Sequence, residues 1–219
     1  MSRFWRNNGL SLVLFAMFAL TLAGQSLVGH RHENEEREEH GKPAQSYGEY
    51  VASPAFLEAT MENWESEFLQ MAVYVLLTVF LFQKGSSESK DPEERAEVDH
   101  LPDPKRKGAP WPVRKGGVVL SLYKNSLGLA LALLFLVSFV LHAVGGAGEY
   151  NEEQASHGGT PVSVLGYLGT SRFWFESLQN WQSEFLAILS MVVLSIFLRQ
   201  HGSPESKPVD AANDETGSG

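Results

Sequence analysis

The chain has 219 residues, of which 43% are hydrophobic, with a formal net charge of −9 and no cysteine. The acidic balance argues against nucleic acid as a partner, because binding to a phosphate backbone needs a basic surface. The lack of cysteine excludes disulfides and cysteine-based metal or redox sites. No phosphate loop, nucleotide fingerprint or zinc motif is found, so we expect a protein that is not an enzyme and needs no cofactor.

The first predicted element is an uncharged apolar segment at about residues 9–29, preceded by Arg3 and Arg6. Its length suffices to cross the ~30 Å hydrocarbon layer of a membrane as a helix. A signal peptide is the alternative, since Ala23-Gly24 offers small residues for cleavage. A matching segment lies in the middle of the chain, at about 118–144, which favours a retained span.

A charge run with three histidines follows the first segment, at residues 30–40. Such a run is typical of a solvated loop, helical in part or disordered. A metal site is the alternative, because imidazole and carboxylate groups together suit zinc, nickel or copper. The weak candidates for its ligands are His30, His32 and His40.

A second span is predicted at about residues 63–83, in a helix that begins at Ser53-Pro54, a good N-cap and first-turn pair. Residues 63–69 read Asn-Trp-Glu-Ser-Glu-Phe-Leu and lead directly into an apolar stretch. That stretch is short for a membrane span, so the motif must lie at the outer edge of the bilayer. We expect the helix to continue outward beyond it.

The segment at 91–117 is predicted to be a cytoplasmic linker, rich in proline in its second half. Its basic residues precede the third span, where they would face anionic lipid headgroups. The tail at 208–219 is polar and predicted to be disordered.

The third and fourth spans are predicted at about 118–144 and 179–199, the fourth in a helix that begins at Thr170 or Ser171. Residues 180–186 match residues 63–69 at six of seven positions, at a spacing of 117. The chain therefore contains two repeats, 1–90 and 118–207, of two spans each. His142 lies near the outer end of the third span, where a polar contact across helices, or with Glu67 or Glu184, is expected.

The placement of basic residues predicts the topology. The N-terminus, residues 83–124 and the C-terminus hold 13 of the 17 Lys and Arg, and the loops at 29–62 and 145–180 hold the rest. Because basic residues concentrate on the cytoplasmic side, both termini and the linker are predicted there. Repeats with an even number of spans have the same orientation and are parallel.

The two motif copies form the candidate site, and three interpretations of it remain open. The residues can anchor the helices at the membrane interface, pair between helices by hydrogen bonds, or handle protons or cations through carboxylates that shift each other's pKa. The members of this polar cluster are Asn63, Trp64, Ser66, Glu67, Asn180, Trp181, Ser183 and Glu184.

Two motifs carry a family resemblance: Phe-Trp-Arg-Asn-Asn-Gly at residues 4–9 and Asn-Trp-x-Ser-Glu-Phe at residues 63–68. With them the chain resembles an uncharacterised bacterial family of small four-helix integral membrane proteins, a domain of unknown function. The resemblance implies a location in the bacterial cytoplasmic membrane. It implies no activity and no functional residue.

The sequence thus predicts an all-α integral membrane protein with four transmembrane helices, arranged as two parallel repeats with extended outer segments. The leading functional hypothesis is a non-enzymatic scaffold or envelope-associated subunit, with the lipid bilayer, another copy of the chain or an envelope protein as partner. One alternative is a small homo-oligomeric transporter or channel for protons or cations that uses Glu67 and Glu184. Another is a metal sensor built on the histidine-rich loop.

Overall fold

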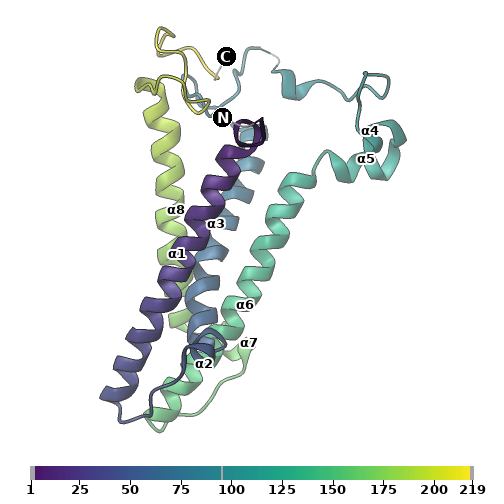
Figure 1. Cartoon of the computed structure of the whole chain (residues 1–219). Coiled ribbons are helices and arrows are strands. Elements are labelled where there is room, and N and C mark those ends of the chain that lie inside the picture. Colours follow the sequence, from purple (N-terminus) through teal and green to yellow (C-terminus); the bar gives the residue numbers. More distant parts are fainter. Residues whose placement is uncertain (1–2, 95, 218–219) are drawn as a thin grey trace. The chain divides into compact units, whose positions relative to one another are not determined.

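The computed structural model describes residues 3–94 and 96–217, which form helices joined by turns and loops without any strand (Figure 1). The long helices are α1 (Arg3–Glu39), α3 (Pro54–Phe80), α6 (Ser126–Ser156) and α8 (Ser171–Phe197). The short ones are α2 (Tyr47–Val51), the 3-10 helix η1 (Glu97–Asp99), α4 (Trp111–Lys115), α5 (Gly117–Tyr123) and α7 (Val164–Tyr167). The all-α prediction is therefore confirmed for the described residues.

Three of the long helices, α1, α6 and α8, are long and apolar enough to cross a membrane. At most 17% of the apolar stretch of any of them is buried within the protein. Side chains such as Leu10, Leu133 and Leu189 therefore face outward, as they would toward lipid. Four glutamates lie in the first half of α3 and lower its average hydropathy, so the fourth predicted span stays a prediction.

The chain divides into two compact units. Unit 1 comprises Met1–Met61 and Leu141–Gly169, and unit 2 comprises Glu62–Val140 and Thr170–Gly219. The division passes through α3 and α6, so each of these helices contributes residues to both units.

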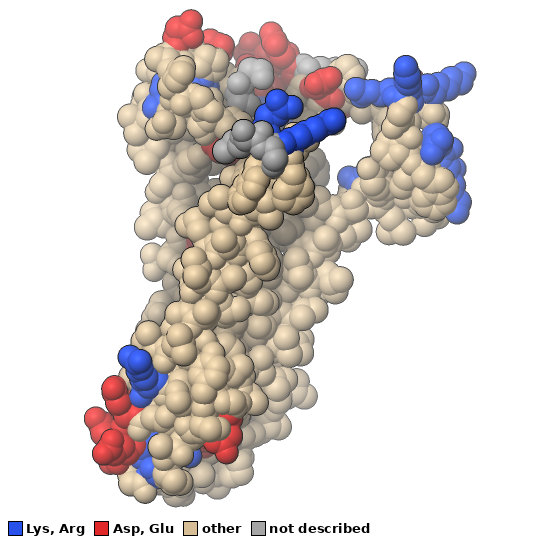
Figure 2. All heavy atoms as spheres, viewed as in Figure 1, with Lys and Arg blue, Asp and Glu red and all other residues tan. Residues whose placement is uncertain are grey.

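In unit 1, the charge run at residues 30–39 is the end of helix α1 rather than a loop. Charged residues gather at the two ends of α1, and its middle is free of them (Figure 2). Asn34 near its end fixes the chain that follows: its side-chain amide donates to the Gln45 carbonyl at 3.1 Å and accepts from the Gln45 N–H at 2.8 Å. Helix α1 and the start of α2 are thereby tied together.

The same arrangement occurs 117 residues later, at the end of α6. The amide of Asn151 donates to the Val162 carbonyl at 2.9 Å and accepts from the Val162 N–H at 2.7 Å. The short helices that follow are both capped by a serine hydroxyl, Ser46 for α2 and Ser163 for α7. Ser46 and Glu49 form a full capping box, and the Ser46 N–H, followed by its hydroxyl, lowers the pKa of the Glu49 carboxyl.

The short helices each bury one tyrosine of unit 1 against a glycine on a long helix. Tyr50 of α2 packs on Gly29 of α1, and Tyr167 of α7 packs on Gly146 of α6. A Cβ atom at Gly146 would lie 2.5 Å from the Tyr167 hydroxyl oxygen, so only glycine leaves room for the ring. These two pairs are also separated by 117 residues.

In unit 2, the apolar segment predicted as a span at about residues 118–144 contains a break between two helices. α5 ends at Tyr123 and α6 begins at Ser126 (Figure 1). The Asn125 side-chain amide donates to the Ser121 carbonyl at 2.7 Å, the local hydrogen bonding by which Asn favours turns. The apolar helix that can cross a membrane therefore starts at Ser126 and runs to Ser156, beyond the predicted end.

The linker in unit 2 carries basic residues beside α4 and α5. Six Lys and Arg lie between residues 105 and 124, without an acidic residue among them, and Figure 2 shows them gathered around the two short helices. Lys115 lies over the ring of Trp111 at 4.8 Å from its centre. This charge distribution is consistent with the predicted contact with lipid headgroups.

The described part of the C-terminal tail folds around Lys207, whose side chain is buried. Its ammonium donates to the carbonyls of Ala212, Asn213 and Glu215 at 2.8–3.1 Å. Arg199 donates to further carbonyls of the same segment, including that of Ala211 at 3.0 Å. Residues 211–215 of the tail make these contacts, and the predicted disorder of residues 208–219 stays a prediction.

Candidate functional site

The N-caps predicted for the two motif helices are confirmed. The Ser53 hydroxyl accepts from the Phe56 N–H at 3.2 Å at the start of α3, and the Thr170 hydroxyl accepts from the Phe173 N–H at 3.3 Å at the start of α8. These caps fix where each helix begins and thereby the register of the motif along it.

Several predicted site residues make hydrogen bonds within their own helix. The hydroxyls of Ser66 and Ser183 donate to the carbonyls of Asn63 and Asn180, each at 2.8 Å. The Asn180 amide donates to the Glu176 carbonyl at 3.2 Å. Local bonds of this kind satisfy polar side chains in apolar helices without linking one helix to another.

The two motif copies do meet within unit 2, through residues of α3 and α8. The Trp181 indole N–H donates to the carboxylate oxygen Oε1 of Glu65 at 2.9 Å. The Gln70 amide donates to the carbonyl of Glu184 at 3.0 Å, and Glu67 lies close enough to Glu184 for their charges to interact. The structure therefore brings the copies together, but with Glu65 as the buried carboxylate.

Glu65 was not among the predicted site residues, although it lies inside the motif. Its side chain is 0% exposed, whereas Glu67 is exposed and Glu184 is half-buried. Glu65 occupies the one position of the motif that differs between the copies, where the second copy has the exposed Gln182. This difference between the copies is the sequence signal that points to Glu65. A residue that both copies share does not have to lie at the contact between them.

The indole that holds Glu65 lies among other aromatic rings. The ring of Trp181 lies edge-on to Phe135, at 6.5 Å between ring centres, and to Trp174 at 6.3 Å. The sequence has no Lys or Arg in residues 43–83, 125–171 or 173–198, which contain nearly all of α3, α6 and α8. Glu65 is therefore a buried carboxyl group at the contact between the two motif copies in unit 2.

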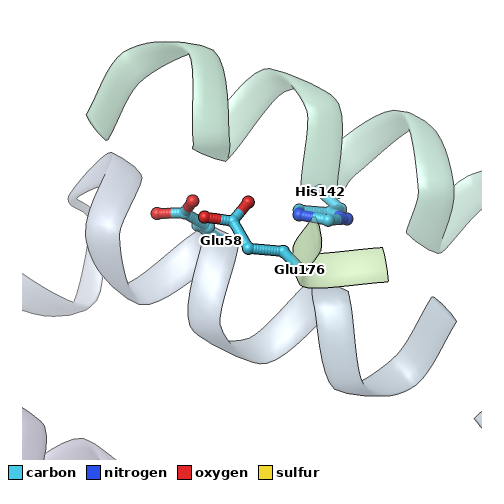
Figure 3. Close-up of side chains that lie close together, drawn as sticks. All are labelled: Glu58, His142 and Glu176. Carbon is cyan, nitrogen blue, oxygen red and sulfur yellow. The ribbon is translucent and has the colours of Figure 1, made fainter. Parts of the chain in front are cut away.

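A second buried polar group lies in unit 1, formed by Glu58, His142 and Tyr167. Glu58 is 7% exposed, and His142 and Tyr167 are 0% exposed. The Tyr167 hydroxyl donates to the Glu58 oxygen Oε1 at 3.3 Å, and a Glu58 oxygen and a His142 ring nitrogen lie within 4.8 Å of each other. Figure 3 shows Glu58 on α3 and His142 on α6 projecting between the two ribbons; Glu176, also labelled, belongs to unit 2.

Glycines on α6 bring the helix segments of this group together in unit 1. A Cβ atom at Gly145 would lie 2.6 Å from the backbone nitrogen of Glu58, and one at Gly148 would lie 2.6 Å from the Pro54 side chain. The backbones of α3 and α6 approach closely at this point because these positions lack a side chain. His142, for which the sequence suggested Glu67 or Glu184 as a neighbour, therefore lies beside Glu58.

The three histidines of the predicted loop, His30, His32 and His40, lie along the end of α1 and the turn after it. A ring nitrogen of His30 lies 2.8 Å from the Gln45 carbonyl, and one of His40 lies 2.8 Å from the Glu36 carbonyl. His32 is exposed and lies 3.8 Å from the Glu36 carboxylate. Among the described residues these three do not converge with other ligands, so the hypothesis of a metal sensor at this loop gains no support.

Comparison with known proteins adds a family but no activity. A family model described as "Domain of unknown function (DUF6766)" matches residues 1–218. No curated protein and no solved structure matches the chain. Any function must therefore be argued from the residues described above.

Proposed function

Since the chain belongs to the DUF6766 family, a domain of unknown function, we propose a role from its own geometry: a non-enzymatic integral membrane protein that handles protons at Glu65. The observation that carries this proposal is a fully buried carboxyl group on α3, held by the indole of the other motif copy. Ionisable residues within membrane helices are costly to keep and commonly mark ion or proton pathways.

The proposal includes four spans, made of two parallel repeats with both termini in the cytoplasm. The matched hydrogen bonds of Asn34 and Asn151, at a spacing of 117, support the repeat. The concentration of basic residues at the termini and between the repeats supports the orientation. Since four helices enclose little space for a pore, the protein would transfer protons as a homo-oligomer or through a chain of polar groups and water.

The geometry favours Glu65 over the repeated pair Glu67 and Glu184 as the proton-binding group. Glu67 is exposed at the surface of the protein, so it does not form an enclosed site. Glu65 is enclosed by protein, and its carboxylate accepts a hydrogen bond from the second motif copy. A group of that kind can couple proton uptake to a change in the surrounding helices.

The test is proton flux into liposomes that contain the purified full-length protein and its Glu65→Gln variant. Glutamine retains a carbonyl oxygen that can accept the Trp181 N–H, and the second motif copy already has Gln182 at the equivalent position. We expect the variant to fold and to lose at least tenfold in flux. The double variant Glu67→Gln/Glu184→Gln is the matched control and should retain flux.

Flux that is equal in the wild type and in Glu65→Gln would contradict the role of Glu65. Flux that is absent from the folded wild type would contradict proton handling altogether. Circular dichroism and gel filtration of each sample establish that the compared proteins are folded.

A scaffold or envelope-associated subunit is the second candidate, because aromatic side chains are exposed at the start of α8. Trp174 is 43% exposed and Phe175 is 67% exposed, ahead of the apolar part of the helix. Such side chains are enriched where proteins bind one another. Under this interpretation the Glu65–Trp181 hydrogen bond has a structural role, and wild-type liposomes show no flux.

A further inference from the structure

We propose that α4 and α5 form a surface anchor that binds anionic phospholipid, with apolar side chains at the level of the headgroups and basic side chains on the phosphates. The sequence predicted only that basic residues of the linker face headgroups, and it placed residues 118–123 inside the third span. The proposal instead makes these residues a separate helix that lies on the membrane. It depends neither on Glu65 nor on proton flux.

The backbone separates these two short helices from the span that follows. α4 ends at Lys115 and α5 begins at Gly117, and Gly116 and Gly117 have φ angles of +69° and +60°. Glycine adopts such angles readily, so the chain can turn sharply between the two helices, which contact each other. A second break, at Lys124 and Asn125, turns α5 away from the axis of α6 (Figure 1). α5 is therefore a separate helix and not the start of α6.

Large apolar side chains of α4 and α5 are exposed. Trp111 of α4 is 58% exposed, and Val118 and Leu122 of α5 are 76% and 58% exposed. Val118 and Leu122 are four residues apart, so they lie on the same face of the helix. Helices that lie in the membrane interface bury an indole and aliphatic side chains of this kind between the headgroups and the acyl chains.

The basic side chains beside this apolar surface are not neutralised by the protein. The six are Lys105, Arg106, Lys107, Arg114, Lys115 and Lys124, and none forms an ion pair with another described residue (Figure 2). No Asp or Glu occurs in residues 104–148. Lys115 lies 4.8 Å from the ring centre of Trp111, so a cation and an apolar side chain face the same partner. Each basic residue close to an anionic membrane strengthens binding about fivefold.

The position of the helices favours a membrane over nucleic acid, whose phosphates would also suit the charge. α5 ends at Tyr123 and α6, which is apolar and long enough to cross a membrane, begins at Ser126. A membrane that α6 crosses is therefore within reach of α5. Nucleic acid would bind the basic side chains through its phosphates, but it offers no apolar layer for Val118 and Leu122.

The experiment measures how well the bilayer covers α5 in the full-length protein. The chain has no cysteine, so a fluorescent label can be attached to Leu122→Cys alone, before reconstitution in phosphatidylcholine vesicles with increasing phosphatidylglycerol. Quenching by acrylamide, a neutral molecule that stays largely in water, reports exposure. With abundant phosphatidylglycerol, we expect quenching at least threefold weaker than for a label on Val98→Cys, an exposed position in η1.

The charge requirement is tested in the labelled Leu122→Cys protein with the added changes Arg114→Gln/Lys115→Gln. Because two cations near the surface are removed, the same protection should need at least twice the fraction of phosphatidylglycerol. The matched control is Arg31→Gln/Lys42→Gln, which removes two exposed cations of unit 1 and should change nothing.

The proposal is overturned if labels on Leu122→Cys and Val98→Cys are quenched equally at every lipid composition. Protection that is independent of phosphatidylglycerol, or unchanged by Arg114→Gln/Lys115→Gln, would contradict binding of anionic lipid. Protection by double-stranded DNA, in vesicles of phosphatidylcholine alone, would assign the basic surface to nucleic acid instead. If Arg114→Gln/Lys115→Gln fails to fold, Lys105→Gln/Lys107→Gln, in the exposed turn before α4, must give the same shift.

Discussion

The indole of Trp181 is the donor that holds the buried carboxyl group of Glu65. Replacing it by phenylalanine keeps an aromatic ring but removes the N–H, which leaves a buried acceptor with one hydrogen bond fewer. We expect Trp181→Phe to lower the free energy of unfolding by ~1–3 kcal/mol. Thermal unfolding in detergent measures this, and Trp174→Phe, at an exposed indole, should change it by less than half as much.

The ionisation of Tyr50 makes the stability of the fold depend on pH in a predictable direction. Burial, followed by the negative charges of Glu33 and Glu149, raises the pKa of its phenol above 10.0. The folded state therefore retains the proton longer than the unfolded state, and stability is full below pH ~10 and falls as the pH rises toward the folded-state pKa.

We therefore expect the melting temperature of the wild type to decline more steeply between pH 9.5 and 11 than that of Tyr50→Phe. Tyr123→Phe serves as a control, because Tyr123 lies at the exposed end of α5. Identical slopes in the wild type and Tyr50→Phe would mean that the phenol of Tyr50 ionises freely in the folded protein.

At the scale of elements, the contact between α3 and α6 in unit 1 depends on glycine. The Cβ atom of an alanine at position 145 would meet the backbone nitrogen of Glu58 at 2.6 Å, and backbone cannot rotate away as a side chain can. We expect Gly145→Ala to destabilise the protein by ~1–3 kcal/mol, in spite of the better helix propensity of alanine.

Gly128→Ala is the matched control on the same helix, because nothing lies within 4 Å of the Cβ position there. It should be neutral or slightly stabilising in the same thermal unfolding experiment, since alanine favours the helix. Equal effects of the two substitutions would show that α6 and α3 are farther apart in solution.

Local signals predicted the elements well, and tertiary contacts explain what they missed. Apolar runs located α1, α6 and α8, and Ser53 and Thr170 marked the helix starts, because caps and periodicity act within a few residues. The Glu58–His142 group joins residues that are 84 positions apart in the chain, through a glycine whose role depends on the neighbouring helix. No local pattern contains that information.

The same limit applies to the motif. Repetition drew attention to positions that both copies share, such as Glu67 and Glu184, whereas the buried carboxylate is at the position where the copies differ. In a pair of similar helices, the contact between them places equivalent positions in different surroundings, and one copy can bury a residue that the other exposes. Differences between repeats are therefore as informative about a site as their identities.

At the scale of the whole molecule, the decisive question is whether α3 crosses the membrane. If it does, Lys42 and Lys107 lie on opposite sides, and Thr160 lies on the same side as Lys42. If only α1, α6 and α8 cross, Lys42 and Lys107 lie on the same side and Thr160 on the other. The two topologies can therefore be distinguished by whether Lys42 and Lys107 lie on the same side of the membrane. This comparison does not require knowing which side is the cytoplasm.

The chain has no cysteine, so in single-cysteine variants at these three exposed positions only the introduced thiol can be labelled. We expect Lys42→Cys and Thr160→Cys to react with a membrane-impermeant maleimide in intact cells, and Lys107→Cys to react only after permeabilisation. This result follows from four spans with the basic linker in the cytoplasm. If Lys42→Cys and Lys107→Cys instead show the same accessibility and Thr160→Cys shows the opposite one, α3 lies on the membrane surface. Glu65 would then lie outside the hydrocarbon layer, on which its proposed role depends.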